Sequence, residues 1–405
     1  MLDIHVVCHL WDLHDEGVED VLDRLQGELG VTGVAVPVVC PATAVLRGHH
    51  GVSPRLFHTE GGAFFPSHEA YYQATRYRPA PASWLKSRDP LGRVVEGCRR
   101  RGLAFRAVMH AAEGGRLAAR HPEAAAKSVF GDPWPNRICL LNPDVQALII
   151  GMSRDLYDTY GPEAIELRDF HGGRPDSVAY TLDPACDVGT TGRALLAVCF
   201  CESCRQLGHT PRPPVDVAGA ARAVEDRLMQ ILETGEVSAT PLHELAEDDP
   251  PLAAYLAARR AALSGFLDRL SAEVGCDLIL HEDDAAPPPD PEAPPLLPPD
   301  ATPGVAAQAF RVPADVPIAD LDLALATARA RTTPPRRTEV VVPICPQPSS
   351  PSGERAALVR ALIRAAEQGV GGVQLDCYGV IPSARMAIVK QAVRFARRTS
   401  GGEPV

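Results

Sequence analysis

Short apolar runs alternate with segments of helical periodicity along the 405-residue chain. Short runs rich in β-branched residues are typical of buried strands, whereas apolar residues spaced three and four apart indicate helices. The predicted strands span residues 2–11, 31–39, 103–110, 163–170, 277–281, 305–312, 339–345 and 370–378. The predicted helices span residues 16–29, 89–102, 143–160, 215–233, 251–274, 318–331, 354–368 and 383–398. This alternation predicts a parallel sheet, either closed into a (β/α)₈ barrel or open and doubly wound.

The polarity of the predicted strands favours the barrel. A strand buried between two layers of helices is apolar on both faces, whereas a barrel encloses a lumen that opens at the carboxyl ends of its strands. Polar or aromatic residues share one face in five of the strands: His5, His9 and Trp11; Arg106 and His110; Glu166 and Arg168; Gln308 and Phe310; and Gln374, Asp376 and Tyr378. We therefore predict a single α/β domain, a (β/α)₈ TIM barrel over residues 1–400.

Two stretches interrupt the barrel pattern. Residues 171–275 follow the fourth strand and form an insertion with a cysteine cluster and two predicted helices. Residues 285–303 are dominated by proline, which forms neither helix nor central strand, so we expect a surface loop there.

The cysteine cluster has metal-ligand spacing. Cys199, Cys201 and Cys204 lie within six residues, and zinc bound by thiolates takes four ligands in a closed structural site. The fourth ligand has three candidates in the chain: Cys139, Cys186 and His209. The alternative to a metal site is a set of reduced cysteines in the core, where free cysteine is common.

Composition narrows the class of protein. The net charge of −11 argues against a nucleic-acid-binding surface, and no apolar run is long enough to cross a membrane. The amino terminus has no signal-peptide pattern, and an odd number of cysteines, 11, indicates reduced thiols in the cytoplasm. We expect a small-molecule or carbohydrate substrate, and the sequence leaves homo-oligomerisation open.

The order of the motifs in residues 100–210 resembles the glycoside hydrolase family 42 β-galactosidases and the uncharacterised glycosidase-like barrels around them. The resemblance rests on the run from Cys139 to Pro143, the following helix, the strand with Glu166 and the cysteine triplet. It implies that Cys139 completes a four-thiolate zinc site. It also implies two catalytic carboxylates, an acid/base at the position of Glu166 and a nucleophile at the end of the seventh strand. The chain departs from the family there, because residues 344–347 contain no carboxylate and Ile165 replaces the asparagine before the acid/base.

Other carboxylates at predicted strand ends are candidates for the second role. They are Asp376, Asp169, and Glu282 with its neighbours Asp283 and Asp284. Three of the carboxylate candidates also have a structural interpretation. Glu166 could form a salt bridge in the lumen with Arg168 or Arg106, and Asp376 could form a hydrogen bond near Tyr378. The acidic residues 282–284 could be the solvated start of a loop.

The remaining candidates are substrate-binding residues around the barrel mouth. His110 and His281 end strands and could act on protons or bind hydroxyls, whereas His5 and His9 lie about 13 Å apart on a strand, too far for one metal. The substrate-binding candidates are His5, His9, Trp11, Arg106, His110, Arg168, His171, His281 and Tyr378. Neither a phosphate-binding glycine loop nor a G-x-S-x-G elbow is present.

Two functions follow from these residues. The first is a glycosidase-like hydrolase that uses Glu166 with Asp376 or Glu282. The second is a barrel that keeps the scaffold and the zinc but binds a carbohydrate or catalyses a lyase, isomerase or transfer reaction.

Overall fold

The computed structural model describes residues 2–48, 55–85, 89–170, 186–208, 214–282, 305–312, 318–332, 334–343 and 351–400. Three expectations lie outside these ranges: His171, the acidic residues 283 and 284, and the whole proline-rich loop at 285–303. The strand-seven end at residues 344–347 lies outside them too.

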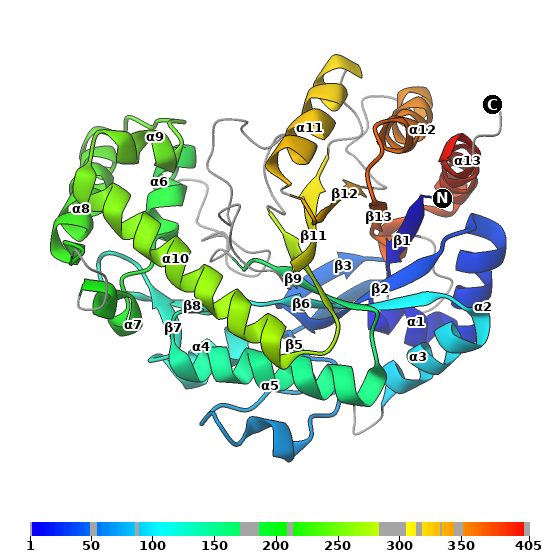
Figure 1. Cartoon of the computed structure of the whole chain (residues 1–405), viewed down its shortest axis with the longest axis horizontal. Coiled ribbons are helices and arrows are strands. Elements are labelled where there is room, and N and C mark those ends of the chain that lie inside the picture. Colours follow the sequence, from blue (N-terminus) through cyan, green and yellow to red (C-terminus); the bar gives the residue numbers. More distant parts are fainter. Residues whose placement is uncertain are drawn as a thin grey trace.

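The chain forms a closed barrel of eight parallel strands with helices around it (Figure 1). The barrel strands are β1 (Asp3–Val7), β2 (Gly33–Cys40), β6 (Ala104–His110), β9 (Ala164–Arg168), β10 (Asp277–His281), β11 (Val305–Arg311), β12 (Arg337–Pro343) and β13 (Gly372–Asp376). β1 closes the barrel by pairing with both β2 and β13, so that His5 lies between Gly33 and Gln374. The predicted (β/α)₈ fold is confirmed.

Local signals in the sequence place the helices outside the barrel. These are α3 (Pro90–Arg101), α5 (Pro143–Tyr160), α11 (Ile318–Arg331), α12 (Pro351–Glu367) and α13 (Ser383–Ser400). α5 shows how the sequence determines where a helix begins and ends. The side chain of Asn142 accepts hydrogen bonds from two backbone amides of the first turn, and Gly161 ends the helix at φ 59°.

The first unit of the barrel differs from the prediction. β1 ends at Val7, and α1 (Leu10–Glu16) begins three residues later, so Trp11 lies on a helix rather than on the predicted strand face. Gly17, at φ 96°, then separates α1 from α2 (Val18–Asp23), which continues into the π-helical η1 (Arg24–Leu29). A positive φ of this kind favours glycine, so the helix predicted at 16–29 begins at Val18 instead of residue 16 and continues to Leu29.

The long segment between β2 and α3 begins at the carboxyl end of β2, where Gly48 N donates to the carbonyl of Gly379 after β13, and it continues onto α5. It contains the hairpin β3 (Thr43–Leu46) and β4 (Leu56–Thr59), the short strand β5 (Gly62–Ala63) on β2, and the 3₁₀ turns η2 (Glu69–Tyr72) and η3 (Ser83–Leu85). Asp155 of α5 anchors it, accepting hydrogen bonds from the backbone amide of His68 at 2.8 Å and the hydroxyl of Tyr72 at 2.9 Å.

The insertion after β9 packs as a second core beside the barrel. It consists of α6 (Gly189–Ala197), α7 (Glu202–Arg205), η4 (Gln206–Gly208), α8 (Val217–Thr234), α9 (Leu242–Glu247) and α10 (Pro250–Glu273). It shares its apolar core with β7 (Ala125–Lys127) and β8 (Pro133–Ile138), an antiparallel hairpin that follows α4 (Gly115–Arg120). α10 runs from this core back to the barrel, where it packs on α5 (Figure 1).

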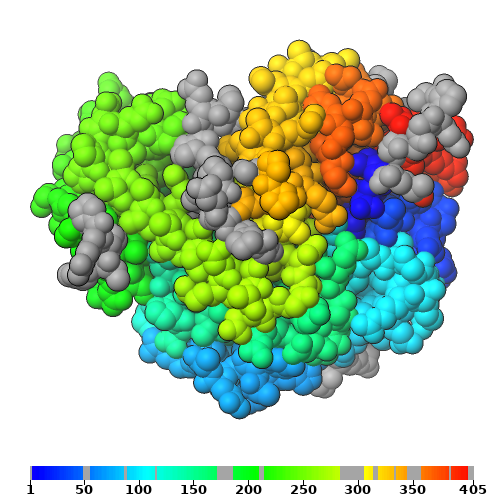
Figure 2. Space-filling view, in the orientation of Figure 1, coloured from blue at the N-terminus to red at the C-terminus, as the bar shows by residue number. Residues whose placement is uncertain are grey.

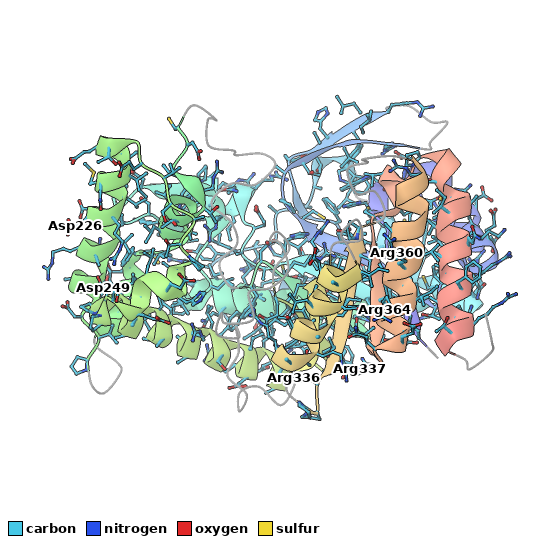
Figure 3. All side chains as sticks on the ribbon, turned by 90° about the horizontal axis from the view of Figure 1, so that it is seen from above. Asp226, Asp249, Arg336, Arg337, Arg360 and Arg364 are labelled. Atoms are coloured by element: carbon cyan, nitrogen blue, oxygen red, sulfur yellow. The ribbon has the colours of Figure 1, made fainter. Side chains whose placement is uncertain are left out.

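The insertion and the carboxyl-terminal helices lie on opposite sides of the molecule. Figure 2 shows the green insertion helices on one side and the orange and red helices on the other. From above, the insertion carries Asp226 and Asp249, whereas Arg360 and Arg364 lie on α12 at the far side (Figure 3). Among the described residues, no helix is long and apolar enough to cross a membrane.

Candidate active site and thiolate centre

Glu166 lies at the centre of a hydrogen-bonded network inside the lumen. Its side chain is fully buried, and Gln374 donates to both carboxylate oxygens, at 2.9 and 2.7 Å. His281 Nε2 lies 3.0 Å from the same carboxylate, and Arg106 Nη1 lies 3.6 Å away. Burial opposes ionisation, but the His281 hydrogen bond and the nearby arginine charges outweigh it and hold the pKa of Glu166 well below its usual range. Glu166 is therefore an ionised, fully partnered carboxylate.

A second buried ion pair lies in the same lumen. Arg106 contacts both carboxylate oxygens of Glu339, at 2.7 and 3.3 Å, and links β6 to β12 across the barrel. His5 is also buried, and neither of its ring nitrogens has a hydrogen-bond partner among the described residues. Burial and the charge of Arg106 lower the pKa of His5 to about 3, so this ring is neutral. Arg106 and His5 thus belong to the barrel interior.

Asp376, at the end of β13, is the carboxylate of the lumen that reaches the mouth. Its side chain is 16% exposed, and it receives a hydrogen bond from Arg311 at 3.2 Å. Arg168 lies 3.9 Å away and donates to Gln374 at 2.7 Å. Burial raises the pKa of Asp376, but the charges of Arg168, Arg311 and His9 outweigh burial and lower it. Asp376 is therefore held as a carboxylate at the opening.

Glu282 follows β10 and is held by two partners. Gln308 donates to one oxygen at 2.7 Å, and Arg331 of α11 lies 3.3 Å from the other. The side chain is 5% exposed. These contacts tie the end of β10 to β11 and to the outer helix.

A third group of titratable side chains lies at the ends of β6 and β9. The ring of His110 contacts Asp169, with Nδ1 2.6 Å from Oδ2. Glu113 comes three residues after His110 and forms an isolated β-bridge with Arg137. Burial and the charge of Asp169 raise the pKa of Glu113 to about 7, although His110 and Arg137 act in the opposite direction. Glu113 is thus a carboxyl group that keeps its proton close to neutral pH.

Glu113 was missed by the sequence reading, and Asp169 was named only as a substitute. Both follow barrel strands, so the rule that selected Asp376 could have selected Glu113 as well. Its raised pKa could not be read from the sequence, because it depends on Asp169, 56 residues further along the chain.

The remaining predicted residues separate into two places. His9 Nδ1 lies 3.1 Å from the sulfur of Cys377, and its ring stacks on Trp11 with 4.2 Å between centroids. Tyr378 turns away from this group: it is fully buried, its hydroxyl donates to Glu16 at 3.1 Å, and it accepts from Arg24. β13 ends at Asp376, so the strand alternation that placed Tyr378 beside Asp376 does not extend to it.

Four cysteines form a buried group at the edge of the insertion. The sulfurs of Cys139, Cys199, Cys201 and Cys204 all lie within 4.8 Å of one another, and those of Cys139 and Cys204 are 3.5 Å apart. A tetrahedral zinc with Zn–S bonds of about 2.3 Å needs sulfurs about 3.8 Å apart, so the donor set fits. Cys186 is exposed and is not part of this group. The structure therefore brings Cys139 to the triplet, while His209 lies outside the described residues.

Hydrogen-bond donors surround the thiolate centre. The backbone amide of Lys127 donates to Cys199 at 3.3 Å, and Arg259 Nη1 donates to Cys204 at 2.6 Å. Arg137 is buried nearby, and in the part of the chain that the structure describes its Nε and Nη1 have no hydrogen-bond partner. Burial lowers the pKa of Arg137, and the charge of Cys199 opposes this effect. Two arginines, Arg137 buried and Arg259 half-buried, thus lie close to the sulfurs, and their positive charges favour the thiolate form of Cys199 and Cys204.

Comparison of the sequence with known proteins gives no match, either among family models or among curated proteins. Comparison of the structure does give matches. An α-L-fucosidase from Paenibacillus thiaminolyticus has a TM-score of 0.55 at 12% identity, over 99% of this chain and 50% of that one. A β-galactosidase from the haloarchaeon Halorubrum lacusprofundi has a TM-score of 0.54 at 11% identity, over 98% of this chain and 58% of that one.

A catalytic mutant of a GH42 β-galactosidase from G. stearothermophilus is similar to the same extent. Its TM-score is 0.53 at 10% identity, over 99% of this chain and 57% of that one. The likeness is one of fold. The chain spans between half and three fifths of the length of these three neighbours, and at this identity their activities do not transfer to it.

Proposed function

We propose that this protein is a glycosidase-like enzyme that acts on a sugar or a glycosylated small molecule through carboxylate acid/base chemistry. The proposal places the reaction at the carboxyl-terminal face of the barrel, where enzymes of this fold carry their catalytic residues. It is supported by the fold shared with three glycoside hydrolases and by the titratable side chains at the ends of β1, β6, β9 and β13.

One observation carries the proposal: two carboxyl groups at the mouth have pKa values shifted in opposite directions. The pKa of Glu113 is raised to about 7 by burial and Asp169, whereas arginine charges lower that of Asp376 in spite of its burial. Glycosidases need one protonated and one ionised carboxyl group, and environments that separate the two pKa values assign these roles.

In this mechanism Glu113 is the general acid and gives its proton to the oxygen of the leaving group. Asp376 is the second carboxylate, which attacks the anomeric carbon or activates a water molecule. The residues between them form a continuous set: Asp169 beside Glu113, His110 on Asp169, and His9 within electrostatic reach of both His110 and Asp376.

The imidazoles have a binding role in this proposal. His9 and His110 present ring nitrogens at the mouth, where sugar hydroxyls are donors and acceptors of hydrogen bonds. The raised pKa of Glu113 depends on burial first, so a substrate that displaces water from the mouth would strengthen its acid character.

Glu166 and Glu282 are assigned positioning roles instead of acid/base roles. A general acid must hold a proton at the working pH, and the surroundings of Glu166 favour the ionised form. Its hydrogen bonds fix Gln374, which in turn accepts from Arg168 beside Asp376. Glu282 is occupied by Gln308 and Arg331.

The four-cysteine group is proposed to hold a structural zinc ion. With four thiolates around it, the metal has no open position for substrate, so it would supply folding energy to the insertion. Cys139 would join the β7–β8 hairpin to the triplet at the start of α7. Four ionised thiols require a reducing compartment, so cytoplasmic localisation belongs to this proposal.

A second candidate function is a barrel of the same type without hydrolysis. It is favoured by the departure from the family pattern at residues 344–347, where no carboxylate is present in the sequence. Such a protein would use Glu113 as an acid in a lyase, isomerase or transfer reaction, or would only bind a carbohydrate.

A panel of nitrophenyl glycosides distinguishes these functions. We expect turnover of at least one glycoside. On the methyl glycoside of the same sugar, whose alkoxide leaving group needs a proton, turnover should fall by about 100-fold or more in Glu113→Gln. The matched control is Glu96→Gln, which removes an exposed carboxylate that pairs with Arg100 on α3. Turnover that survives Glu113→Gln contradicts the assignment of the acid, and inertness across the panel favours the second function.

A further inference from the structure

A small cavity lies beside the proposed acid, on the outer side of β2 and β6. It has a volume of about 50 Å³ and is enclosed by the end of β2, the β5 segment, the start of α4 and the middle of α5. One water molecule needs roughly 10–15 Å³ of such space, so the cavity has room for roughly four waters or for one small ring.

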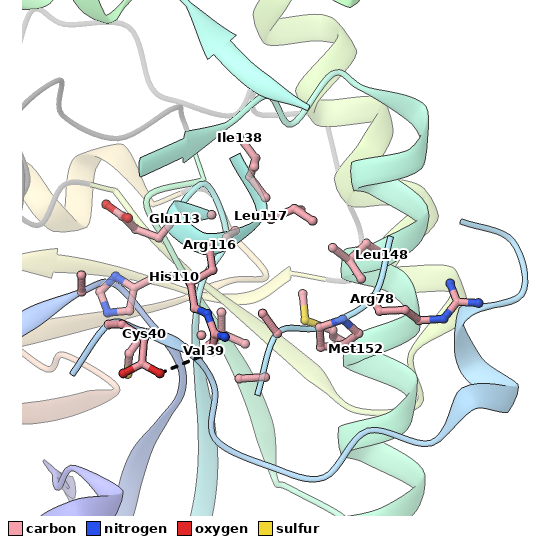
Figure 4. A pocket seen from close by; sticks show the side chains of 18 residues that line it. Val39, Cys40, Arg78, His110, Glu113, Arg116, Leu117, Ile138, Leu148 and Met152 are labelled. Carbon is pink, nitrogen blue, oxygen red and sulfur yellow. Dashed lines mark hydrogen bonds and ion pairs between the residues drawn. The ribbon is translucent and has the colours of Figure 1, made fainter. Parts of the chain in front are cut away.

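The side chains around the cavity divide it into an apolar floor and a polar end (Figure 4). Leu148 and Met152 of α5 form the floor together with Leu117 and Ile138. A surface of this kind favours carbon over water, because water there finds few hydrogen-bond partners.

The polar end is the proposed active site itself. His110 and Glu113 line the cavity from the loop after β6, the same two side chains that neighbour Asp169. A group that occupies the cavity therefore has one end against carbon and the other within the surroundings of the acid.

An ion pair borders the cavity on the side of His110 in the view of Figure 4. Arg116 Nη1 lies 3.4 Å from a carboxylate oxygen of Glu60, which Figure 4 marks with a dashed line, and it donates to the carbonyl of Pro81 at 2.5 Å. Arg116 pairs with Glu60, and Arg78, which also lines the cavity, pairs with Glu69, so neither arginine selects a charged ligand. The chemistry of the lining fits an uncharged group.

We propose that this cavity is the subsite for an apolar group of the substrate, a single aromatic ring or a short alkyl chain, joined to the rest of the substrate through an oxygen at Glu113. The inference deepens the proposed function and rests on it: in a glycoside, this group is the aglycone. It narrows the substrate class to glycosides of small apolar alcohols or phenols.

Binding of phenol to the full-length protein tests the inference independently of turnover. Ala42 and Leu117 both line the cavity and are half-buried, so Ala42→Phe and Leu117→Phe fill it from two different walls. Ala44→Phe is the matched control, because Ala44 is exposed on the neighbouring hairpin strand and does not line the cavity. Phenol binding is followed by calorimetry, and folding of each variant by its urea midpoint.

We expect phenol to bind the wild type and the control, and to bind each filled variant at least tenfold more weakly. The ratio of kcat/KM for a phenyl glycoside over the methyl glycoside of the same sugar should fall by about tenfold in the filled variants. No phenol binding by the wild type, or equal binding by all folded variants, overturns the subsite. Phenol binding in the expected order without turnover of any glycoside supports the subsite and overturns the proposed hydrolysis.

Discussion

His110 and Asp169 meet across the ends of two neighbouring barrel strands, with 2.6 Å between Nδ1 and Oδ2. The charge of Asp169 raises the pKa of Glu113, and His110 acts on the same carboxyl group in the opposite direction. The pair therefore adjusts the proton affinity of a third residue, and this arrangement leads to the first prediction.

Replacing Asp169 with asparagine should lower the pKa of Glu113 below 7, because the neutral amide no longer repels the ionised form. Activity that depends on protonated Glu113 falls as pH rises through this pKa, so the alkaline limb of the kcat/KM profile should move to lower pH. A carboxyl-carbon NMR titration of Glu113 measures the same shift without substrate. Asp158→Asn, on the exposed partner of Tyr71, should leave both curves unchanged.

Glu113→Gln should stabilise the protein at high pH only. The pKa of Glu113 is raised in the folded state, so its folded form binds more protons than the unfolded chain between about pH 4.5 and 7, and stability falls with rising pH across this window. Glutamine does not ionise, so the stability of the variant does not fall across this window. Urea unfolding should show a gain that grows from pH 5 to pH 7 and is constant above; a pH-independent gain would contradict the raised pKa.

Glu166→Gln should destabilise the barrel by about 3 kcal/mol, because it removes the buried negative charge that His281 and Arg106 face in the lumen. The free energy of unfolding measures this effect, and Glu96→Gln on the surface should change it by less than about 0.5 kcal/mol. If Glu166 were the general acid instead, its substitution would abolish turnover and leave stability nearly intact.

Metal analysis of the purified protein should find about one zinc per chain. Cys201→Ser should release the metal and lower the thermal midpoint, because zinc binding contributes to folding. Cys186→Ser is the matched control, since this thiol is exposed and outside the group. A zinc-free preparation with an unchanged midpoint would show that the four thiols stabilise the insertion without a metal.

Much of the barrel could be predicted because its signals are local. The predicted helix at residues 318–331 coincides with α11, and the strand at 277–281 coincides with β10. Each of these boundaries is set by a few neighbouring residues. The first strand was predicted too long because Trp11 suits a strand by composition, while its position on α1 depends on packing against His9 and Phe57.

The candidate site was less predictable because it depends on residues that meet only in the fold. Periodicity indicated that Glu166 faces inwards, but its immobilisation by Gln374 and His281 joins strands more than 100 residues apart in sequence. The raised pKa of Glu113 arises in the same way. The cysteine group could be predicted, because three of its four members lie within six residues of the sequence and the family resemblance indicated Cys139 as the fourth.

The path of α10 shows how the insertion is joined to the barrel. The chain leaves the barrel at the end of β9 and returns to the paired neighbour β10, and α10 packs on α5 as an ordinary barrel helix would. Helices α6 to α9 are therefore an excursion within one standard strand-to-strand connection. The pairing of β9 with β10 therefore does not depend on the length of this excursion, because α10 restores the usual position of the connecting helix on α5.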